Sequence, residues 1–437
     1  MMRVMENAGY RLHAPRALLS ILLLLFGLLA ADAQTGVDRL PPETDDVRRA
    51  YLATALGPLS GIEAVAAGIE YSRASGLRVM VSTESNQQYR YLLFVPELEA
   101  QFAISTAGSY ILRRRRSDGA VDQLKIFLRN DPGFYLRVVP AGDTRSLLTL
   151  SLADTEVYRS VPLPVTVETL LAEPFERIVE MTRARIDWAR VYPAGGSLGH
   201  DEVAMMAGRA RSMLHTLPDA EDGAMDEFGR LVFIESLAVQ EVDPGLNCSG
   251  FAKWIVDGLH LGLHGSFLPV EQLKARHVDL RGHRWSAALE EQRDPYFGLD
   301  WTRNLATAML SAQHGGREVH PKAADVRNVA YTTYVEDIGY RIDRLPLIMY
   351  LLASRDPGHI YLGSVNREFG DDPPLNQHVH VVVLFPYLDT KGRLHVDVME
   401  RNVETSMASL VRRYGGDAVH LVRVRADLAY TPPVIRN

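Results

Sequence analysis

The sequence predicts an α+β protein with a β-rich N-terminal domain and a C-terminal domain in which helices precede a strand hairpin. Short strand-like runs separated by turn residues fill residues 77–152, which is typical of an antiparallel sheet. Helical periodicity follows over residues 175–214, and a hairpin pattern lies between residues 377 and 402. The chain has 437 residues, of which 47% are hydrophobic, so it is large enough for two domains with separate cores.

The first 33 residues have the pattern of an export signal. Three arginines supply a positive n-region, residues 17–29 form an apolar core, and Ala31-Asp32-Ala33 offers a cleavage site before Gln34. The apolar run is shorter than a transmembrane helix requires, and no later run approaches 18 apolar residues. We therefore expect a cleaved signal peptide and an exported product, periplasmic or secreted, without a stable transmembrane segment. An uncleaved anchor is the alternative.

The formal net charge of −7 argues against general nucleic-acid binding. The one basic block, residues 113–116, precedes Ser117-Asp118-Gly119 and is interpreted as a strand end beside a turn, with contact to an anionic polymer as the alternative. The chain has no glycine-rich phosphate loop, and the spaced pair His260 and His264 lacks the glutamate of a zinc-binding helix motif. No nucleic acid, metal or other cofactor is therefore expected.

The β-rich N-terminal domain is expected to span residues 34–165. A helical segment over residues 45–70 opens it, and turn sequences such as Asn130-Asp131-Pro132-Gly133 separate the strands that follow. The strand-like runs cover residues 77–81, 89–95, 101–105, 124–128, 134–139 and 147–152. Their order predicts an antiparallel sheet that ends near Pro162.

A helical connector is expected over residues 166–230, with one helix near 175–191 and a second near 203–214. The C-terminal domain then covers residues 231–437. Within it, residues 260–370 are irregular and rich in His, Arg, Tyr and Trp, and we interpret them as a large insertion. Loops of this length are usually functional or disordered, so we expect this segment to be ordered and to line or cover a cleft beside Cys248.

Cys248 is the only cysteine, so no internal disulfide can form. Ser249 and Gly250 suit a helix entry, and Phe251 and Trp254 begin an apolar pattern at helical spacing. A cysteine in the first turn of a helix lies at the positive end of the dipole, which favours the thiolate. A lone cysteine is otherwise a buried core residue or a partner for another chain. The context favours a reactive thiol.

The second informative stretch is a strand that carries His378 and His380, followed by the hairpin turn Asp389-Thr390-Lys391-Gly392 and a return strand. Strand alternation places both histidines on one face. The expected register sets His380 opposite Glu400 and His378 opposite Asn402, with all four on that face. One hairpin would thus supply a general base and a residue to orient it, which a thiol nucleophile requires.

These segments resemble the NlpC and CHAP families of papain-like cysteine peptidases, which cleave peptide or amide bonds in bacterial cell walls. The similar features are Asn-Cys-Ser-Gly-Phe at a helix start, a His-Val-x-Val strand and Glu-x-Asn on the next strand. The resemblance implies a papain-like C-terminal domain with Cys248 as the nucleophile. It implies His380 as the base, because an apolar strand follows it directly, and Glu400 and Asn402 as the polar pair. His378 competes with His380 for the role of base.

The expected function is thiol-dependent hydrolysis of an amide bond, with peptidoglycan stem peptides or another peptide as substrate. Cys248 attacks the carbonyl, His380 takes the thiol proton and protonates the leaving amine, and Glu400 or Asn402 orients the imidazole. One alternative is a non-catalytic envelope-binding protein on a degenerate papain-like scaffold. Another is acyl transfer by the same dyad to an acceptor other than water. The sequence does not reveal the protein partners.

Overall fold

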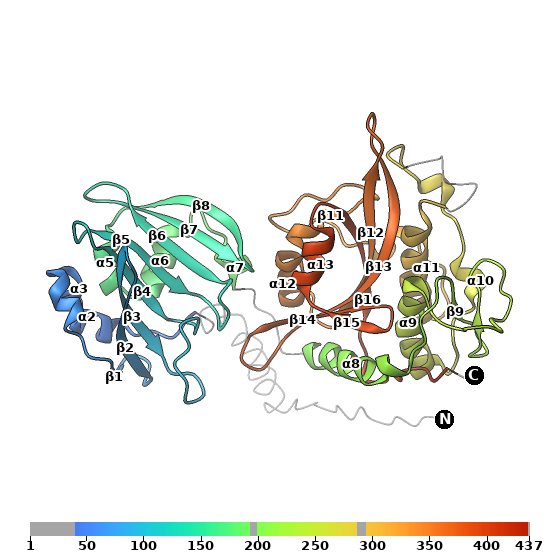
Figure 1. The fold of residues 1–437 in the computed structure, drawn as a ribbon, viewed down its shortest axis with the longest axis horizontal. Helices are drawn as coiled ribbons and strands as arrows, with labels where there is room; N and C mark the ends of the chain where they lie inside the picture. Colours follow the sequence, from blue (N-terminus) through green and yellow to red (C-terminus); the bar gives the residue numbers. More distant parts are fainter. Residues whose placement is uncertain (1–39, 193–198, 286–293, 436–437) are drawn as a thin grey trace, which may run out of the picture. The chain divides into compact units, whose positions relative to one another are not determined.

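The computed structural model describes residues 40–192, 199–285 and 294–435 (Figure 1). These ranges contain both helices and antiparallel sheets, which confirms the predicted α+β class. The expected signal peptide lies outside the described residues. None of the helices within these ranges is both long and apolar enough to cross a membrane.

The first sheet of the described chain has eight antiparallel strands that pair in chain order. They are β1 (Gly68–Tyr71), β2 (Arg78–Ser85), β3 (Tyr89–Pro96), β4 (Tyr110–Arg115), β5 (Val121–Phe127), β6 (Tyr135–Pro140), β7 (Ser146–Leu152) and β8 (Thr155–Leu163). Burial alternates along β6, where Leu136 and Val138 are fully buried, so one face of the sheet forms a core. The predicted run at 101–105 is not a strand, and β1 and β8 were not predicted as separate strands.

The basic block at residues 113–116 ends β4, as predicted. Arg115 pairs with Asp118 in the turn that follows. Arg114 is buried, and its guanidinium donates hydrogen bonds to the carbonyl oxygens of Ala55 and Gly57. The basic block therefore stabilises the turn after β4 and the contact of β4 with the helical segment at residues 55–57.

Short helices surround the first sheet. They are α2 (Asp45–Ala50), α3 (Leu52–Leu56), α4 (Leu59–Glu63), α5 (Val167–Ala172), α6 (Phe175–Thr182) and α7 (Trp188–Val191). The buried guanidinium of Arg48 donates to the carbonyl oxygens of Leu171 and Glu173, which ties α2 to α5. The predicted helical connector over 166–230 is therefore wrong in its first half, because the apolar faces of α5 and α6 belong to the core of the first sheet.

The second sheet is antiparallel with the order β11-β16-β12-β13-β14-β15. Its strands are β11 (Tyr340–Arg341), β12 (His359–Phe369), β13 (Leu375–Leu388), β14 (Leu394–Glu400), β15 (Val403–Thr405) and β16 (Ala418–Arg425). A small two-stranded sheet pairs β9 (Ala224–Met225) with β10 (Leu231–Val232). The helices are α8 (His200–Met213), α9 (Cys248–His264), α10 (Val270–Leu273), α11 (Phe297–Gln313), α12 (Leu345–Arg355) and α13 (Met407–Tyr414), with short 3-10 turns η2 (Leu214–Thr216), η3 (Val278–Leu280), η4 (Pro321–Ala324) and η5 (Ile342–Arg344).

One large apolar core joins α8, α9 and α11 to the second sheet. Trp254 of α9 and Trp301 of α11 are fully buried in it. Figure 1 shows α9 and α11 side by side against the sheet, with α12 and α13 across the sheet from them. Since α8 packs on β13, the second half of the predicted connector belongs to this core.

Residues 260–370 are not an insertion, so that prediction is wrong. Strand β12 lies within the range and is hydrogen-bonded on both sides, to β13 and β16. Helix α11 also lies within it and contributes Trp301 to the core. The irregular texture arises because α11 buries polar side chains too, such as Arg303, which pairs with Asp325 and Asp337. These buried ion pairs interrupt the apolar periodicity that marks a core helix.

Candidate active site

Cys248 is the first residue of α9, as predicted. Asn247 caps the helix, and its side-chain oxygen accepts a hydrogen bond of 2.8 Å from the N–H of Gly250. The N–H groups of Cys248 and Ser249 have no intrahelical acceptor, because they belong to the first turn. Gly250 allows a close approach to the chain beside β9, since a Cβ there would lie 1.9 Å from the carbonyl oxygen of Gly223. The thiol therefore lies at the positive end of the helix dipole.

The histidine strand β13 contains a bulge at Val379. On β12, Val365 pairs with His380 while its neighbour Asn366 pairs with His378, so one residue of β13 is left over between them. Bulges bend a strand and re-aim its side chains, and they are frequent beside active sites. The strict alternation predicted for the two histidines is therefore wrong. Both histidines nevertheless act on the Cys248 thiol, and each lowers its pKa.

His380 lies between the thiol and Glu400. Its Nε2 donates a hydrogen bond of 2.7 Å to Oε2 of Glu400, which leaves Nδ1 as the ring nitrogen for Cys248. The other carboxylate oxygen of Glu400 pairs with Arg413 of α13. Tyr414 stacks on the imidazole at 5.9 Å between ring centroids. Both ends and one face of the His380 ring thus have defined neighbours.

His378 is held by a different set of contacts. Ser364 of β12 donates to Oδ1 of Asn366 at 3.0 Å, so its oxygen accepts a hydrogen bond of 3.1 Å from Nδ1–H of His378. The amide nitrogen of Asn366 donates to the carbonyl oxygen of Ile338, so the Asn366 oxygen is the acceptor for Ser364. The three residues form a hydrogen-bond relay that runs from His378 through Ser364 to Asn366. Gly298 of α11 packs against the imidazole. This histidine is oriented by neutral groups, whereas His380 is oriented by a carboxylate.

The charges of the site favour a thiolate. Burial raises the pKa of the Cys248 thiol, but hydrogen bonds from His378 and His380 and their positive charge outweigh burial and hold the pKa well below its usual value. Burial alone would lower the pKa of His380, whereas hydrogen bonds with Cys248 and Glu400 and the charge of both raise it to about 9. Burial raises the pKa of Glu400, but hydrogen bonds from His380 and Arg413 bring it below its usual value. These shifts favour the thiolate form of Cys248, the imidazolium form of His380 and the carboxylate form of Glu400.

The hairpin register differs from the prediction by two residues. Val383 pairs with Met399, and the ladder between β13 and β14 ends there, before His380 is reached. A shift of two preserves the faces of the strand, so the predicted contact between His380 and Glu400 is confirmed. The contact predicted for Asn402 is wrong. Its side chain lies in the turn after β14 and donates to the carbonyl oxygen of Leu217 at 3.0 Å.

The residues that hold the histidines in place were not among the predicted site residues. Ser364 and Asn366 lie on β12, which was assigned to the insertion, and Gly298 lies on α11 in the same range. Arg413 and Tyr414 end α13, a helix that was not predicted. Ser364 and Asn366 are two residues apart on a strand and therefore share a face, and this spacing could have indicated a polar site there. Nothing local marks the contact of α13 with Glu400.

Gly298→Ala should disturb His378, because a Cβ at this position would lie 2.0 Å from Nδ1 of the ring. We expect a loss of about 1–3 kcal/mol in the free energy of unfolding, the usual cost of overpacking. Urea unfolding of the purified protein measures this change. Gly208→Ala in α8 is the matched control, since no atom lies within 4 Å of its Cβ position and alanine favours a helix by about 0.5–1 kcal/mol. Equal stabilisation by both substitutions would contradict the packing described.

Across residues 40–192, 199–285 and 294–435, no group of three or more His, Cys, Asp or Glu side chains is arranged to hold a metal ion. His260 Nδ1 contacts the carbonyl oxygen of Ser266, and its ring lies against His264. This pair belongs to the end of α9.

Comparison with known families gives a match to the N-terminal part of the chain. A family model described as a domain of unknown function (DUF8515) matches residues 39–190. The matched range coincides with the first sheet and the helices from α2 to α7, and it excludes every residue of the candidate active site. No curated protein and no solved structure matches the chain.

Proposed function

We propose that this protein is an exported thiol hydrolase that cleaves an amide bond, with peptidoglycan stem peptides as the substrate class. The observation that carries the proposal is the position of His380, which bonds Cys248 through one ring nitrogen and Glu400 through the other. A base held between a nucleophile and an orienting carboxylate is the arrangement that activates a thiol. The export signal expected at residues 1–33 supports a periplasmic or secreted location.

A papain-like scaffold is part of the same proposal. A helix that begins with the nucleophile packs on an antiparallel sheet whose neighbouring strands supply the base and its partner. This is the arrangement implied by the resemblance to the NlpC and CHAP families. Of the polar pair implied by that resemblance, Glu400 fits the orienting role and Asn402 does not.

The proposed reaction proceeds through a thioester. The Cys248 thiolate attacks the carbonyl carbon, a C–S bond forms, and the oxygen gains a negative charge beside the N–H groups of Cys248 and Ser249. Imidazolium His380 gives its proton to the leaving nitrogen as the C–N bond breaks. Water then attacks the thioester, His380 accepts a proton from it, and the thiolate leaves. Glu400 keeps the imidazole aligned and stabilises its charged form.

His378 has a secondary role in this scheme. Its contact with the thiol adds to the stabilisation of the thiolate, and its relay through Ser364 ends at neutral groups. An imidazolium is stabilised less by a relay of neutral groups than by a direct hydrogen bond to a carboxylate. We therefore assign the proton transfers to His380 and electrostatic support of the thiolate to His378.

Thiol reactivity tests the proposal directly. We expect iodoacetamide to alkylate Cys248 at a nearly constant rate from pH 8 down to acidic pH, because the low thiol pKa keeps the thiolate populated. An ordinary thiol of pKa about 8.5 would lose a factor of ten per pH unit over the same range. Turnover of cell-wall fragments, followed by mass spectrometry of new ends, should fall above about pH 9 as His380 loses its proton. Alkylation should not fall there, because the thiolate persists.

The control for this experiment is the same protein in urea, in which Cys248 should show the ordinary profile. Since the chain has a single cysteine, Cys248→Ser accounts for any labelling elsewhere. If Cys248 reacts only after unfolding, the thiol is a packed core residue and the non-catalytic binding protein becomes the better explanation. Its position in the apolar core at 9% exposure makes this comparison necessary.

A further inference from the structure

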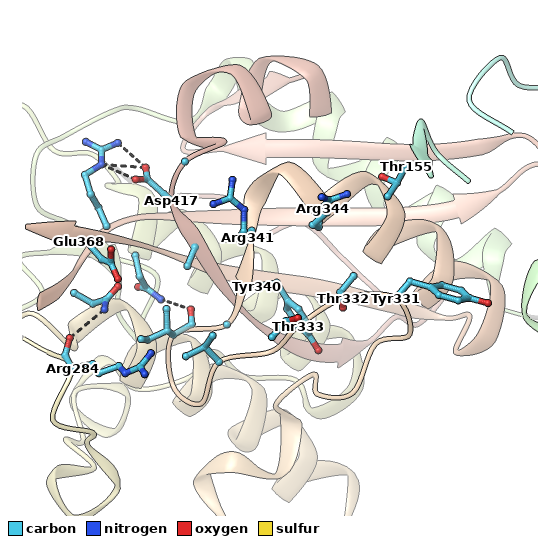
Figure 2. A pocket seen from close by; sticks show the side chains of 18 of the residues that line it. Thr155, Arg284, Tyr331, Thr332, Thr333, Tyr340, Arg341, Arg344, Glu368 and Asp417 are labelled. Carbon is cyan, nitrogen blue, oxygen red and sulfur yellow. Dashed lines mark hydrogen bonds and ion pairs between the residues drawn. The ribbon is translucent and has the colours of Figure 1, made fainter. Parts of the chain in front are cut away.

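A cavity rich in arginine lies at the edge of the second sheet. Its volume is about 830 Å³, within the range of small-molecule sites. Five arginines line it, namely Arg159, Arg284, Arg341, Arg344 and Arg367, against three carboxylates. Figure 2 shows Arg284, Arg341 and Arg344 around the cavity together with Asp417 and Glu368. A positive excess is unusual on a chain whose net charge is −7.

The positive excess comes mainly from two neighbouring arginines. Arg341 and Arg344 share one carboxylate, that of Asp343, at 2.9 Å and 3.7 Å. One carboxylate cannot neutralise two guanidinium groups. Both arginines are about half exposed or more, at 63% and 47%, so their remaining N–H groups are available to a ligand. Arg367, by contrast, is neutralised by a two-pronged pair with Asp417.

The wall of this cavity reaches the active site by two routes. Asn366 lines the cavity and is the end of the relay from His378 through Ser364. Arg367 lies 5.9 Å from the centre of the Tyr414 ring, and that ring stacks on His380. Each histidine is therefore separated from the cavity by one layer of side chains. The cavity wall and the two histidines thus share this layer of side chains.

We infer that this cavity binds the carboxylates of an acidic peptide substrate. This inference rests on the proposed function and names its substrate class. Guanidinium groups bind carboxylates through paired, charge-assisted hydrogen bonds, which suits Arg341 and Arg344. The buried cluster of Arg303, Asp325 and Asp337 could not serve in this way, because its own carboxylates occupy the guanidinium.

Binding to the Cys248→Ala protein tests this inference without turnover. We expect calorimetry at low salt to detect tri-glutamate, and to find binding at least about tenfold weaker for tri-glutamine amide, since that peptide lacks the charges that strengthen hydrogen bonds to guanidinium groups. Adding Arg341→Gln and Arg344→Gln to this protein should weaken tri-glutamate binding by about tenfold or more. Arg177→Gln, an exposed arginine of α6 outside the cavity, is the matched control and should change nothing.

Three results would overturn the inference: equal affinity for the two peptides, unchanged affinity in the double arginine variant, or inorganic phosphate binding as tightly as tri-glutamate. The first two would exclude carboxylate recognition, and the third would indicate a general anion site. Because both arginines are exposed, their replacement should leave the thermal unfolding midpoint unchanged, which checks folding. Failure of the hydrolase proposal looks different. In that case Cys248 resists alkylation in the folded protein while the binding results stand.

Discussion

His380→Ala should lower turnover by about 10²–10⁴-fold, the usual contribution of a general acid–base residue. The same change should shift the alkylation profile of Cys248 towards that of an ordinary thiol, because hydrogen bonding and charge from His380 help to hold the thiol pKa down. Both effects have one cause, the loss of the group that pairs with the thiolate. Initial rates on cell-wall fragments and the pH profile of iodoacetamide labelling measure them separately.

Two companion variants locate the base. His378→Ala should cost much less turnover, since its relay through Ser364 ends at neutral groups. Glu400→Gln should fall between the two histidine variants, because it weakens the orientation of the imidazole without removing it. If His378→Ala is inactive and His380→Ala is active, the roles of the two histidines are the reverse of those assigned here.

Arg303→Met should destabilise the protein by about 3 kcal/mol, at the low end of the range for breaking a buried ion pair. The guanidinium bonds Asp325 at 2.7 Å and Asp337 at 2.8 Å, and methionine would leave both carboxylates without this partner. The cost stays at the low end because Arg327 still contacts Asp325 and Lys322 still contacts Asp337. Urea unfolding followed by circular dichroism gives the change in the free energy of unfolding.

Arg177→Met provides the comparison, because Arg177 pairs with Glu180 on the exposed surface of α6. Exposed pairs contribute about 0–1 kcal/mol, so this variant should unfold close to the parent. If Arg303→Met unfolds at the same urea concentration as Arg177→Met, the buried cluster adds no stability, and α11 is held to the sheet by its apolar residues alone.

Short-range sequence patterns correctly predicted the helix start at Cys248 and the turn after β13. The helix start at Cys248 follows from Asn247 as a cap and from the apolar spacing behind it, and both are short-range properties. The turn after β13 follows from Asp389 and Gly392, and the structure has a tight turn there. The contact between His380 and Glu400 was predicted despite the wrong register, since an even shift leaves the strand faces unchanged.

The remaining errors arise where tertiary contacts override local pattern. Val379 suits a regular strand as well as a bulge, so the sequence gives no sign that β13 is bulged there. Strand β12 was taken for part of an insertion because buried ion pairs disguise the core helix α11 before it. The residues of β12 and α13 that contact the histidines or Glu400 could consequently not be predicted from the sequence. Pairing across a sheet between distant segments cannot be read from propensity alone.

The low thiol pKa of Cys248 exists only in the folded chain, because it depends on β13 for both histidines and, through Glu400 and Arg413, on β14 and α13. An unfolded chain carries an ordinary thiol, with only a few per cent thiolate at neutral pH. Newly made protein is therefore nearly unreactive until its second sheet is complete. The thiol therefore gains its reactivity only when these strands and α13 have come together, and an unfolded chain would react with small electrophiles as slowly as an ordinary thiol does.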